Sequence, residues 1–340
     1  MPNPLSALNK FLARYRIDPY IVALLTTVGL ASVLPVHGPA AAGLGGVTKL
    51  AIGVLFFLHG ARLSREAVIA GITHWRLHLT ILASTFVLFP ILGLFASHLP
   101  AALLSPPLAT GILFLCCLPS TVQSSIAFTS IARGNIAAAV CAASASNLIG
   151  ILLTPVLAGL LLRSHGGFSL DQIWSIVEQL LLPFLAGQIA RRWIGGWVGR
   201  HRYILGLFDR GSIILVVYTA FSEAVTGGIW HQVSALEIGK LLVICGVLLA
   251  IVLGITAWGA RVMGFDKADE ITIVFCGSKK SLASGVPMAS ILFPAATVGM
   301  VVLPLMIFHQ IQLMACAYLA QRYAARTERA APGGEPVAAS

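Results

Sequence analysis

The sequence predicts an all-α polytopic membrane protein with ten transmembrane helices, built as two inverted five-helix repeats in which helices 4 and 9 are broken. Three observations lead to this fold class. Hydrophobic residues make up 58% of the 340 residues and charged residues 10%, whereas soluble proteins have roughly 45–50% and 25%. The apolar residues gather in ten long runs. The fourth run of each set of five contains a polar interruption.

Each apolar run is long enough to cross a membrane as a helix. About 20 apolar residues span the hydrocarbon core of a bilayer, and in segments of this length only a helix satisfies every backbone group. The strands of a membrane β-barrel would instead be segments of about ten residues with alternating polarity. The ten runs are 19–35, 43–61, 77–97, 107–131, 136–162, 172–192, 204–227, 238–263, 268–292 and 296–320.

The composition excludes several classes of function. A chain with so few charged residues cannot cover a globular surface, which argues against a soluble enzyme and a disordered protein. The formal net charge of +10 does not indicate a nucleic-acid partner, because most basic residues lie in short connectors between apolar runs. The six cysteines lie within apolar runs and lack CxxC spacing. We interpret them as packing residues and expect no metal and no cofactor.

The basic residues also predict the orientation in the membrane. Seventeen of the 22 lysine and arginine residues fall on the same side as the N-terminus, and only Lys49, Arg163 and Lys240 fall on the other. We therefore expect a multi-pass protein of the cell inner (plasma) membrane, surrounded by membrane lipid, with both termini cytoplasmic. We interpret the first run as an uncleaved span rather than a signal peptide. The basic stretch 191–210 is interpreted as a connector anchored at the inner surface, with binding of anionic lipid or a partner as the alternative.

These expectations divide the chain into four parts. Residues 1–18 form a cytoplasmic N-terminal segment, 19–163 the first five-helix repeat and 169–321 the second. Residues 322–340 contain Ala-Pro-Gly-Gly-Glu-Pro and are expected to be a disordered cytoplasmic tail. An odd number of spans in each repeat requires the second repeat to start from the opposite side of the membrane. Inverted repeats are typical of secondary transporters.

The polar interruptions lie at 117–125 in the fourth run and at 276–285 in the ninth. Either one alone is compatible with a kinked helix packed by small residues. Paired breaks at equivalent positions indicate a transport site. Half-helices beginning near Ser124 and Ser281 would direct two positive dipole ends at an anion, while freed carbonyl groups could hold a cation.

Lys279 and Lys280 lie inside the second interruption. A lysine at the centre of a membrane costs on the order of 3 kcal/mol, so neither is expected to face lipid. We expect one of the two ammonium groups to face the space between the two interruptions. There it would bind an anionic group of the substrate or take the place of a coupling cation. The alternative is a structural lysine paired with carbonyl groups or with a buried carboxylate such as Glu223.

The candidate site residues belong to the two interruptions and to neighbouring spans. The candidates for substrate or ion binding are Gln123, Ser124, Ser125, Ser278, Lys279, Lys280, Ser281 and Ser284. The candidates for additional lining are Asn147, Glu223, His309 and Gln310, together with Gln312 and Ser144. His59 and Arg62, at the end of the second run, are interpreted as anchors at the membrane surface.

Several of these segments resemble the bile acid:sodium symporter superfamily, specifically its divergent SBF-like branch. The segments are Phe56–Ser64, Trp75–Leu79, Pro119–Ser125, Arg133–Asn135 and Phe275–Met288. The resemblance extends over roughly residues 10–323 and implies ten spans, a panel and a core domain, and crossing broken helices 4 and 9. Sodium-coupled members carry Glu and then Gln-Asn in the ninth helix, where this chain has Phe275 and Lys279-Lys280. The resemblance thus implies a degraded sodium site.

We expect a secondary active transporter of a small or amphipathic organic anion that works by alternating access, and not an enzyme. Coupling to Na⁺ is left open, and H⁺ carried by a desolvated lysine is the other possibility. Two alternatives come from other classes. The first is an intramembrane enzyme acting on a lipid or peptide, with Ser281 and Lys280 as a nucleophilic dyad. The second is a membrane sensor that binds a ligand without transporting it.

Overall fold

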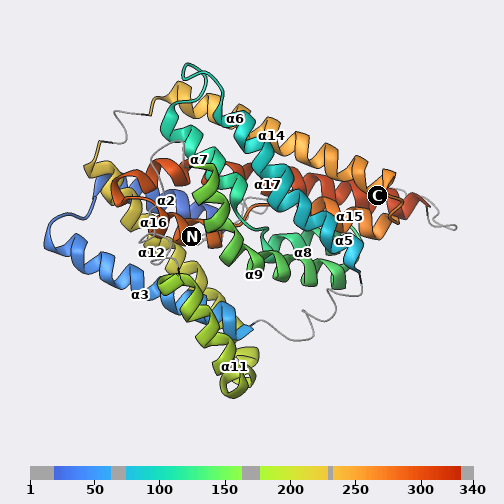
Figure 1. Ribbon diagram of the computed structural model, residues 1–340, viewed down its shortest axis with the longest axis horizontal. Helices are drawn as coiled ribbons and strands as arrows, with labels where there is room; N and C mark the ends of the chain where they lie inside the picture. Colours follow the sequence, from blue (N-terminus) through green and yellow to red (C-terminus); the bar gives the residue numbers. More distant parts are fainter. Residues whose placement is uncertain (1–18, 63–73, 163–176, 229–232, 331–340) are drawn as a thin grey trace, which may run out of the picture.

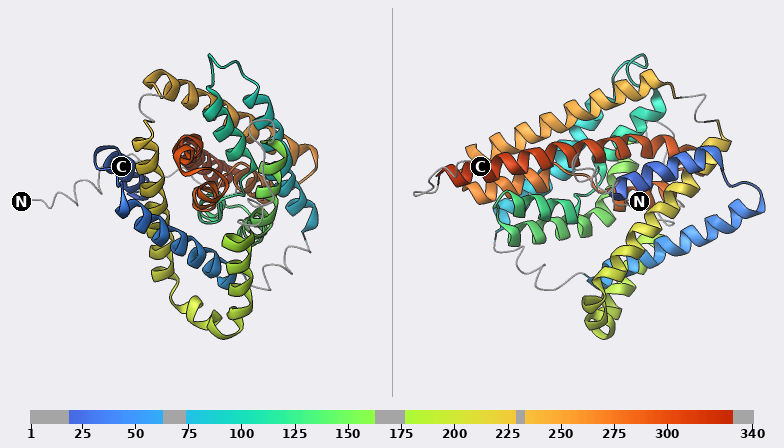
Figure 2. Two further views of the ribbon diagram at one scale, coloured as in Figure 1. Left: turned by 60° about the vertical axis from the view of Figure 1, so that its left-hand side comes forward. Right: turned by 180° about the vertical axis from the view of Figure 1, so that it is seen from behind.

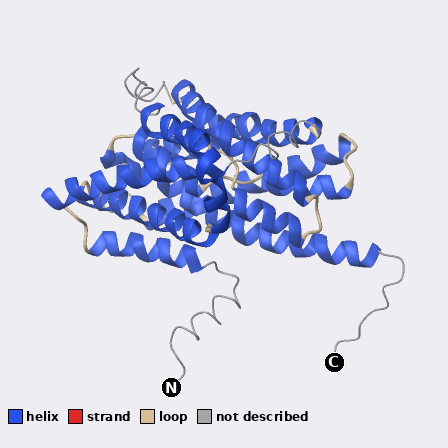
Figure 3. Ribbon diagram, turned by 90° about the horizontal axis from the view of Figure 1, so that it is seen from below, coloured by secondary structure: helices blue, strands red, loops and turns tan. Residues whose placement is uncertain are grey.

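The computed structural model describes residues 19–62, 74–162, 177–228 and 233–330, and all regular secondary structure in these ranges is helical (Figure 3). The all-α prediction is therefore confirmed for the described residues. The helices, in chain order, are α2 Pro19–Val33, α3 Pro39–Arg62, α5 Trp75–Ala83, η1 Ser84–Leu88, α6 Phe89–Ser97, α7 Pro106–Cys117, α8 Val122–Ile131, α9 Ile136–Leu161, η3 Val177–Leu181, α11 Leu182–Arg200, α12 Arg202–Thr226, α14 Ala235–Val262, α15 Lys267–Gly277, α16 Leu282–Leu292 and α17 Ala295–Ala330 (Figure 1).

Six of these helices are long and apolar enough to cross a membrane, counting α5, η1 and α6 as one continuous helix. The others are α3, α9, α12, α14 and α17. The pair α7 and α8 provides a seventh candidate span, because the two helices together pass the same test but are bent by 64° at their junction. The chain is thus a multi-pass helical membrane protein.

The helices form two groups that lie side by side (Figure 2). The smaller group contains α2, α3, α11 and α12, drawn in blue and yellow-green, and the larger group contains α5 to α9 and α14 to α17. Contacts of α12 with α16 and α17 join the groups. One continuous apolar core, which includes Ile52, Phe114 and Phe308, runs through both.

Within the smaller group, α3 and α11 touch backbone to backbone. A Cβ atom on Gly60 would lie 2.1 Å from the carbonyl oxygen of Phe184, and one on Gly187 would lie 1.9 Å from that of Phe57. Only glycine permits this approach, which is the usual role of small residues between membrane helices. Gln188 Nε2 also donates to Gly60 O at 2.7 Å. The two helices are therefore expected to move as one unit.

Two helices are longer than predicted. The stretch 191–210, predicted to be a connector, is helical except at His201, because α11 continues to Arg200 and α12 begins at Arg202. The tail predicted to be disordered from residue 322 continues α17 as far as Ala330, and residues 331–340 lie outside the described part. The first stretch contains several Arg residues, and the second contains Arg and Ala. Both residue types have high helix propensity, so the helices continue beyond their apolar segments. Hydrophobicity marked the apolar core of these helices and not their ends.

Candidate functional site

Both predicted interruptions are present. Residues 118–121 separate α7 from α8, and residues 278–281 separate α15 from α16. Pro119 lacks a backbone N–H and disfavours helical geometry at the residue before it, and Leu118 is accordingly extended. At the second break, Ser281 begins α16 as its N-cap and accepts a hydrogen bond from Ser284 N at 3.2 Å.

The two breaks lie against each other and satisfy one another's backbone groups. Ser281 N donates to Pro119 O at 2.9 Å, the only direct backbone hydrogen bond between the breaks in the described residues. Side chains at and just after the first break add further bonds: Ser120 Oγ donates to Cys276 O at 2.6 Å, Thr121 Oγ1 to Lys280 O at 2.9 Å and Ser125 Oγ to Phe275 O at 3.1 Å. Non-helical backbone at membrane depth persists only with such partners.

Two amide side chains from neighbouring helices hold the breaks in place. Asn147 on α9 donates to Ser120 O at 2.9 Å and accepts from Ser284 Oγ at 2.8 Å, so it ties the first break to the start of α16. Gln312 on α17 accepts from Lys280 N at 2.9 Å and donates to Lys280 O at 3.0 Å. Gln312 was a candidate for lining, but it is fully buried and supports the second break instead.

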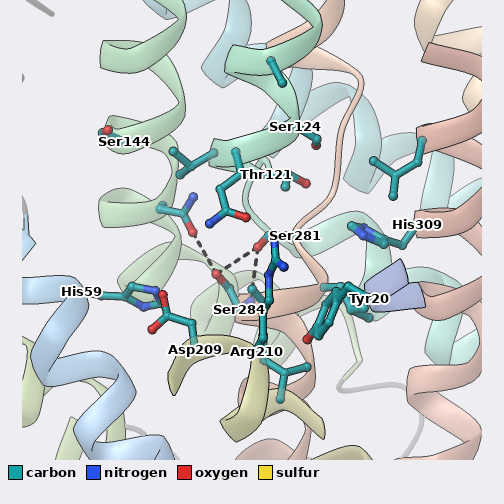
Figure 4. A pocket seen from close by; sticks show the side chains of 18 of the residues that line it. Tyr20, His59, Thr121, Ser124, Ser144, Asp209, Arg210, Ser281, Ser284 and His309 are labelled. Atoms are coloured by element: carbon teal, nitrogen blue, oxygen red, sulfur yellow. Dashed lines mark hydrogen bonds between the residues drawn. The ribbon is translucent and has the colours of Figure 1, made fainter. Parts of the chain in front are cut away.

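A cavity of about 690 Å³ lies beside the breaks (Figure 4). The first turns of α8 and α16, residues 121–124 and 281–284, form part of its wall, so two helix N-termini meet the same space. Eight of the predicted residues line it: Gln123, Ser124, Ser144, Asn147, Ser281, Ser284, His309 and Gln310. These residues come from four helices, which only the tertiary structure brings together.

The remaining candidates lie elsewhere. Ser125 and Ser278 are buried, and their hydroxyl groups donate to Phe275 O at 3.1 Å and Val274 O at 2.6 Å. Glu223 is in the wall of a separate cavity of about 100 Å³, which it shares with Lys49. It is therefore not the partner of either lysine in the second break.

Neither lysine lines the large cavity. Lys280 Nζ donates to three backbone carbonyl oxygens at 2.7–2.8 Å. Lys279 Nζ lies 4.0 Å from the centre of the Phe128 ring and has no hydrogen-bond partner among the described residues. The prediction that an ammonium faces the crevice is thus not supported, because both side chains turn into the protein and are fully buried. Lys280 also has no donor left for Ser281, which argues against a nucleophilic dyad.

Residues 18–325 match the model of the SBF-like CPA transporter family. The chain belongs to this family. The match covers both breaks and every cavity-lining residue named above, and it agrees with the superfamily predicted from the sequence motifs.

The relatives of this SBF-like transporter span bacteria and vertebrates. This chain is 59% identical over 320 residues to the uncharacterized protein PA2026 of Pseudomonas aeruginosa, and the aligned region covers 94% of this chain and 96% of that protein. It is 57% identical over 314 residues to YfeH of Escherichia coli, which is named as a candidate symporter, covering 92% and 95%. Sodium/bile acid cotransporter 7 of Rattus norvegicus is 29% identical over 312 residues, covering 90% and 92%.

The smaller helix group of this SBF-like transporter contributes charged residues that the sequence analysis did not place in the site. Arg62 on α3 forms an ion pair with Asp209 on α12, and both line the cavity. The neighbouring Arg210 guanidinium lies 5.6 Å from the centre of the Tyr20 ring. His59, like Arg62, was interpreted as a surface anchor and also lines the cavity. Their position in the site depends on the packing of α12 beside α3.

The cavity wall of this SBF-like transporter contains polar atoms that lack hydrogen-bond partners among the described residues. Ser124 Oγ and Gln310 Oε1 are buried and lack hydrogen-bond partners among the described residues. The side chain of Thr121, the N-cap of α8, donates to Lys280 O and does not cap its own helix. The first N–H groups of a helix have no intrahelical acceptor. The N-terminus of α8 therefore offers unused donors to a ligand in the cavity.

Proposed function

We propose that this chain is a secondary active transporter that moves a small or amphipathic organic anion across the cell inner (plasma) membrane by alternating access. The observation that carries this proposal is the convergence of two helix N-termini, those of α8 and α16, on one cavity. A helix N-terminus presents free N–H groups and a partial positive charge, and both favour an anion.

The other groups in the wall fit an anion with an apolar body. Arg210 supplies a positive charge at one side of the cavity, while the Arg62 charge is neutralised by Asp209. Phe56 and Phe184 contribute aromatic surface. The volume of about 690 Å³ is within the range of roughly 300–1,000 Å³ that is typical of small-molecule sites.

We also propose the ten-span architecture, with inverted repeats at 19–163 and 169–321. The breaks at 118–121 and 278–281 support it because they occur in the fourth predicted span of each half and lie against each other. The α15 and α16 pair would then be the ninth span. Four of its charged residues, Asp269, Glu270, Lys279 and Lys280, are buried inside the protein rather than facing lipid, and Lys267 at its first residue is exposed.

The distribution of charge supports cytoplasmic termini. Arg76 Nη2 donates to Met263 O at 2.9 Å, and Arg261 and Lys267 both bond Glu270 at 2.9 Å, so predicted inner-side residues from distant parts of the chain lie together. Arg62 and Arg210 belong to the same predicted side and line the cavity, which would then open toward the cytoplasm.

Alternating access would be a movement of the smaller helix group against the larger one. The cavity lies between them, because α2, α3, α11 and α12 provide one part of its wall and α8, α9, α16 and α17 the other. Rocking of one bundle against another around a fixed site is the usual mechanism in transporters with inverted repeats. The backbone contact at Gly60 and Gly187 would keep α3 and α11 together during the movement.

The proposal is tested by screening organic anions for thermal stabilisation of the purified protein, followed by uptake of the stabilising anions into proteoliposomes. Arg210→Gln should weaken binding of such an anion about tenfold, or about 1.4 kcal/mol, because it removes the charge from the cavity wall. Arg192→Gln is the matched control, because Arg192 is exposed on α11 and is not part of the wall. Equal weakening in both variants, or binding without uptake, would contradict the proposal.

A further inference from the structure

The side chain of Lys280 ends in a ring of three backbone carbonyl oxygens. Its Nζ atom donates to Leu118 O at 2.7 Å, to Cys116 O at 2.8 Å and to Thr85 O at 2.8 Å. The side chain is completely buried, and the Phe89 ring centre lies 4.1 Å from the ammonium. All three N–H donors of the ammonium are therefore used, and each acceptor belongs to the main chain.

The first break leaves two of these oxygens without their helical donors. α7 ends at Cys117, and the last carbonyl groups of a helix have no intrahelical donor and carry a partial negative charge. The donor for Cys116 O in a continued helix would be Ser120 N, which instead donates to Ser146 Oγ at 3.0 Å. Leu118 is extended, so its oxygen points out of the helix.

The third oxygen is freed by a separate irregularity. Residues 84–88 form a turn of π-helix, η1, between α5 and α6. In an α-helix Phe89 N would donate to Thr85 O, but here it donates to Ser84 O. The next residue, Pro90, has no N–H to offer. Thr85 O thus has no backbone donor in its own helix, and such π-bulges are frequent at functional sites.

Buried carbonyl oxygens grouped at a helix break form a cation site. In secondary transporters, unwound carbonyl groups and the C-terminal ends of half-helices bind the coupling Na⁺ or H⁺. In this chain a positive charge already occupies such a ring and is covalently attached to the other broken helix. We propose that Lys280 is a tethered cation that replaces a mobile metal ion at the crossing of the breaks, so that the protein needs no Na⁺ to assemble its site or to transport.

The test uses thermal unfolding of the purified full-length protein in detergent. Lys280→Ala removes a propylammonium group and should lower the unfolding midpoint by about 5 °C. Added n-propylammonium should restore most of the loss, because it fits the space and supplies three N–H donors. Tetramethylammonium, which has no N–H group, and neutral 1-propanol should not. Lys280→Met is the matched control, since its side chain fills the space and should prevent rescue.

The wild-type protein provides a measurement that does not depend on any variant folding. Its unfolding midpoint should be the same in NaCl and in choline chloride at equal ionic strength. Stabilisation that is specific for Na⁺ and saturates would overturn the proposal, as would a Lys280→Ala variant that propylammonium does not rescue or rescues no better than 1-propanol does.

The inference about Na⁺-independent transport rests on the proposed function, whereas the rescue does not. If the anion screen fails while propylammonium rescues Lys280→Ala, the transport proposal is contradicted and the tethered cation stands. Once a transported anion is known, its uptake into proteoliposomes should be equal with Na⁺ and with choline outside. Uptake that requires Na⁺ would overturn the inference and leave the transport proposal intact.

Discussion

Two neighbouring residues of the second break have opposite surroundings. Lys280 points toward the carboxyl end of α7, where it bonds three carbonyl oxygens and lies over Phe89. Lys279 points toward α8, with its ammonium 4.0 Å from the centre of the Phe128 ring and 6.0 Å from that of Phe275, and it has no hydrogen-bond partner among the described residues. Both are fully buried.

The difference shows that burial of a charge does not reveal its role. Desolvation costs each ammonium several kcal/mol. For Lys280 the carbonyl groups offset this cost and in turn depend on the ammonium, since they would otherwise be unpaired. For Lys279 the compensation that the described residues offer comes from Cys316 and Cys276 and from the attraction of ring faces, which is worth about 2 kcal/mol when desolvated. Lys280 should therefore be a structural requirement, and Lys279 a tolerated charge.

The largest effect is expected for Lys280→Met. The substitution keeps most of the length of the side chain but leaves Thr85 O, Cys116 O and Leu118 O unpaired. An unpaired buried polar group costs about 1–3 kcal/mol, so the free energy of unfolding should fall by about 3 kcal/mol or more. The measurement is SDS-induced unfolding in mixed micelles. A loss below about 1 kcal/mol would show that the carbonyl ring does not need the ammonium.

A smaller effect is expected for Gln312→Leu, which tests the other support of the same break. The amide bonds both the N–H and the C=O of Lys280, and leucine can bond neither. Lys280 N would be left unpaired, whereas Lys280 O keeps the hydrogen bond from Thr121 Oγ1. The free energy of unfolding should therefore fall by about 2 kcal/mol. Gln123→Leu is the matched control: Gln123 is exposed in the cavity wall, so this variant should keep its stability. An equal loss of unfolding free energy in both variants would show that the effect does not come from the hydrogen bonds of Gln312 to Lys280.

The smallest effect is expected for Lys279→Met, and its sign should differ. Methionine is one atom shorter than lysine, can pack against Phe128 and Phe275, and removes a charge that has no hydrogen bond within the described part of the chain. Replacing a poorly compensated buried charge by an apolar side chain is often neutral or stabilising. The free energy of unfolding should stay constant or rise by about 1 kcal/mol in the same mixed-micelle assay. A loss as large as that of Lys280→Met would remove the distinction between the two lysines.

Much of this organisation was predictable from local chemistry. The length and hydrophobicity of the apolar runs predicted the helices. Pro119 and its polar neighbours predicted the position of the first break. The serines around 281 marked the second. Gln123, Ser124, Ser281 and Ser284 were selected because polar groups within a membrane-spanning run need a reason to be there. All four line the cavity.

Other parts of the site were not predictable in this way. Arg62 and His59 resemble ordinary residues of a membrane interface, and Asp209 and Arg210 lie near the start of an apolar run. Their arrangement around one cavity depends on α12 packing beside α3, and no local pattern encodes that pairing. That the carbonyl oxygen of Thr85 lacks a backbone donor in its own helix could not be predicted from the sequence either, because a π-turn differs from an α-turn by a single shifted hydrogen bond.

The sequence by itself determined that the chain is helical, that it belongs in a membrane, and that two of its helices are interrupted by polar residues. These features follow from hydrophobicity, from backbone hydrogen bonding in lipid and from the missing N–H of proline, and each acts over a few residues. Tertiary structure alone decided where the two lysines point. A side chain on an unwound segment takes the direction in which its charge finds partners. The carbonyl groups that bind Lys280 and the Phe128 ring nearest to Lys279 come from helices far away in the sequence.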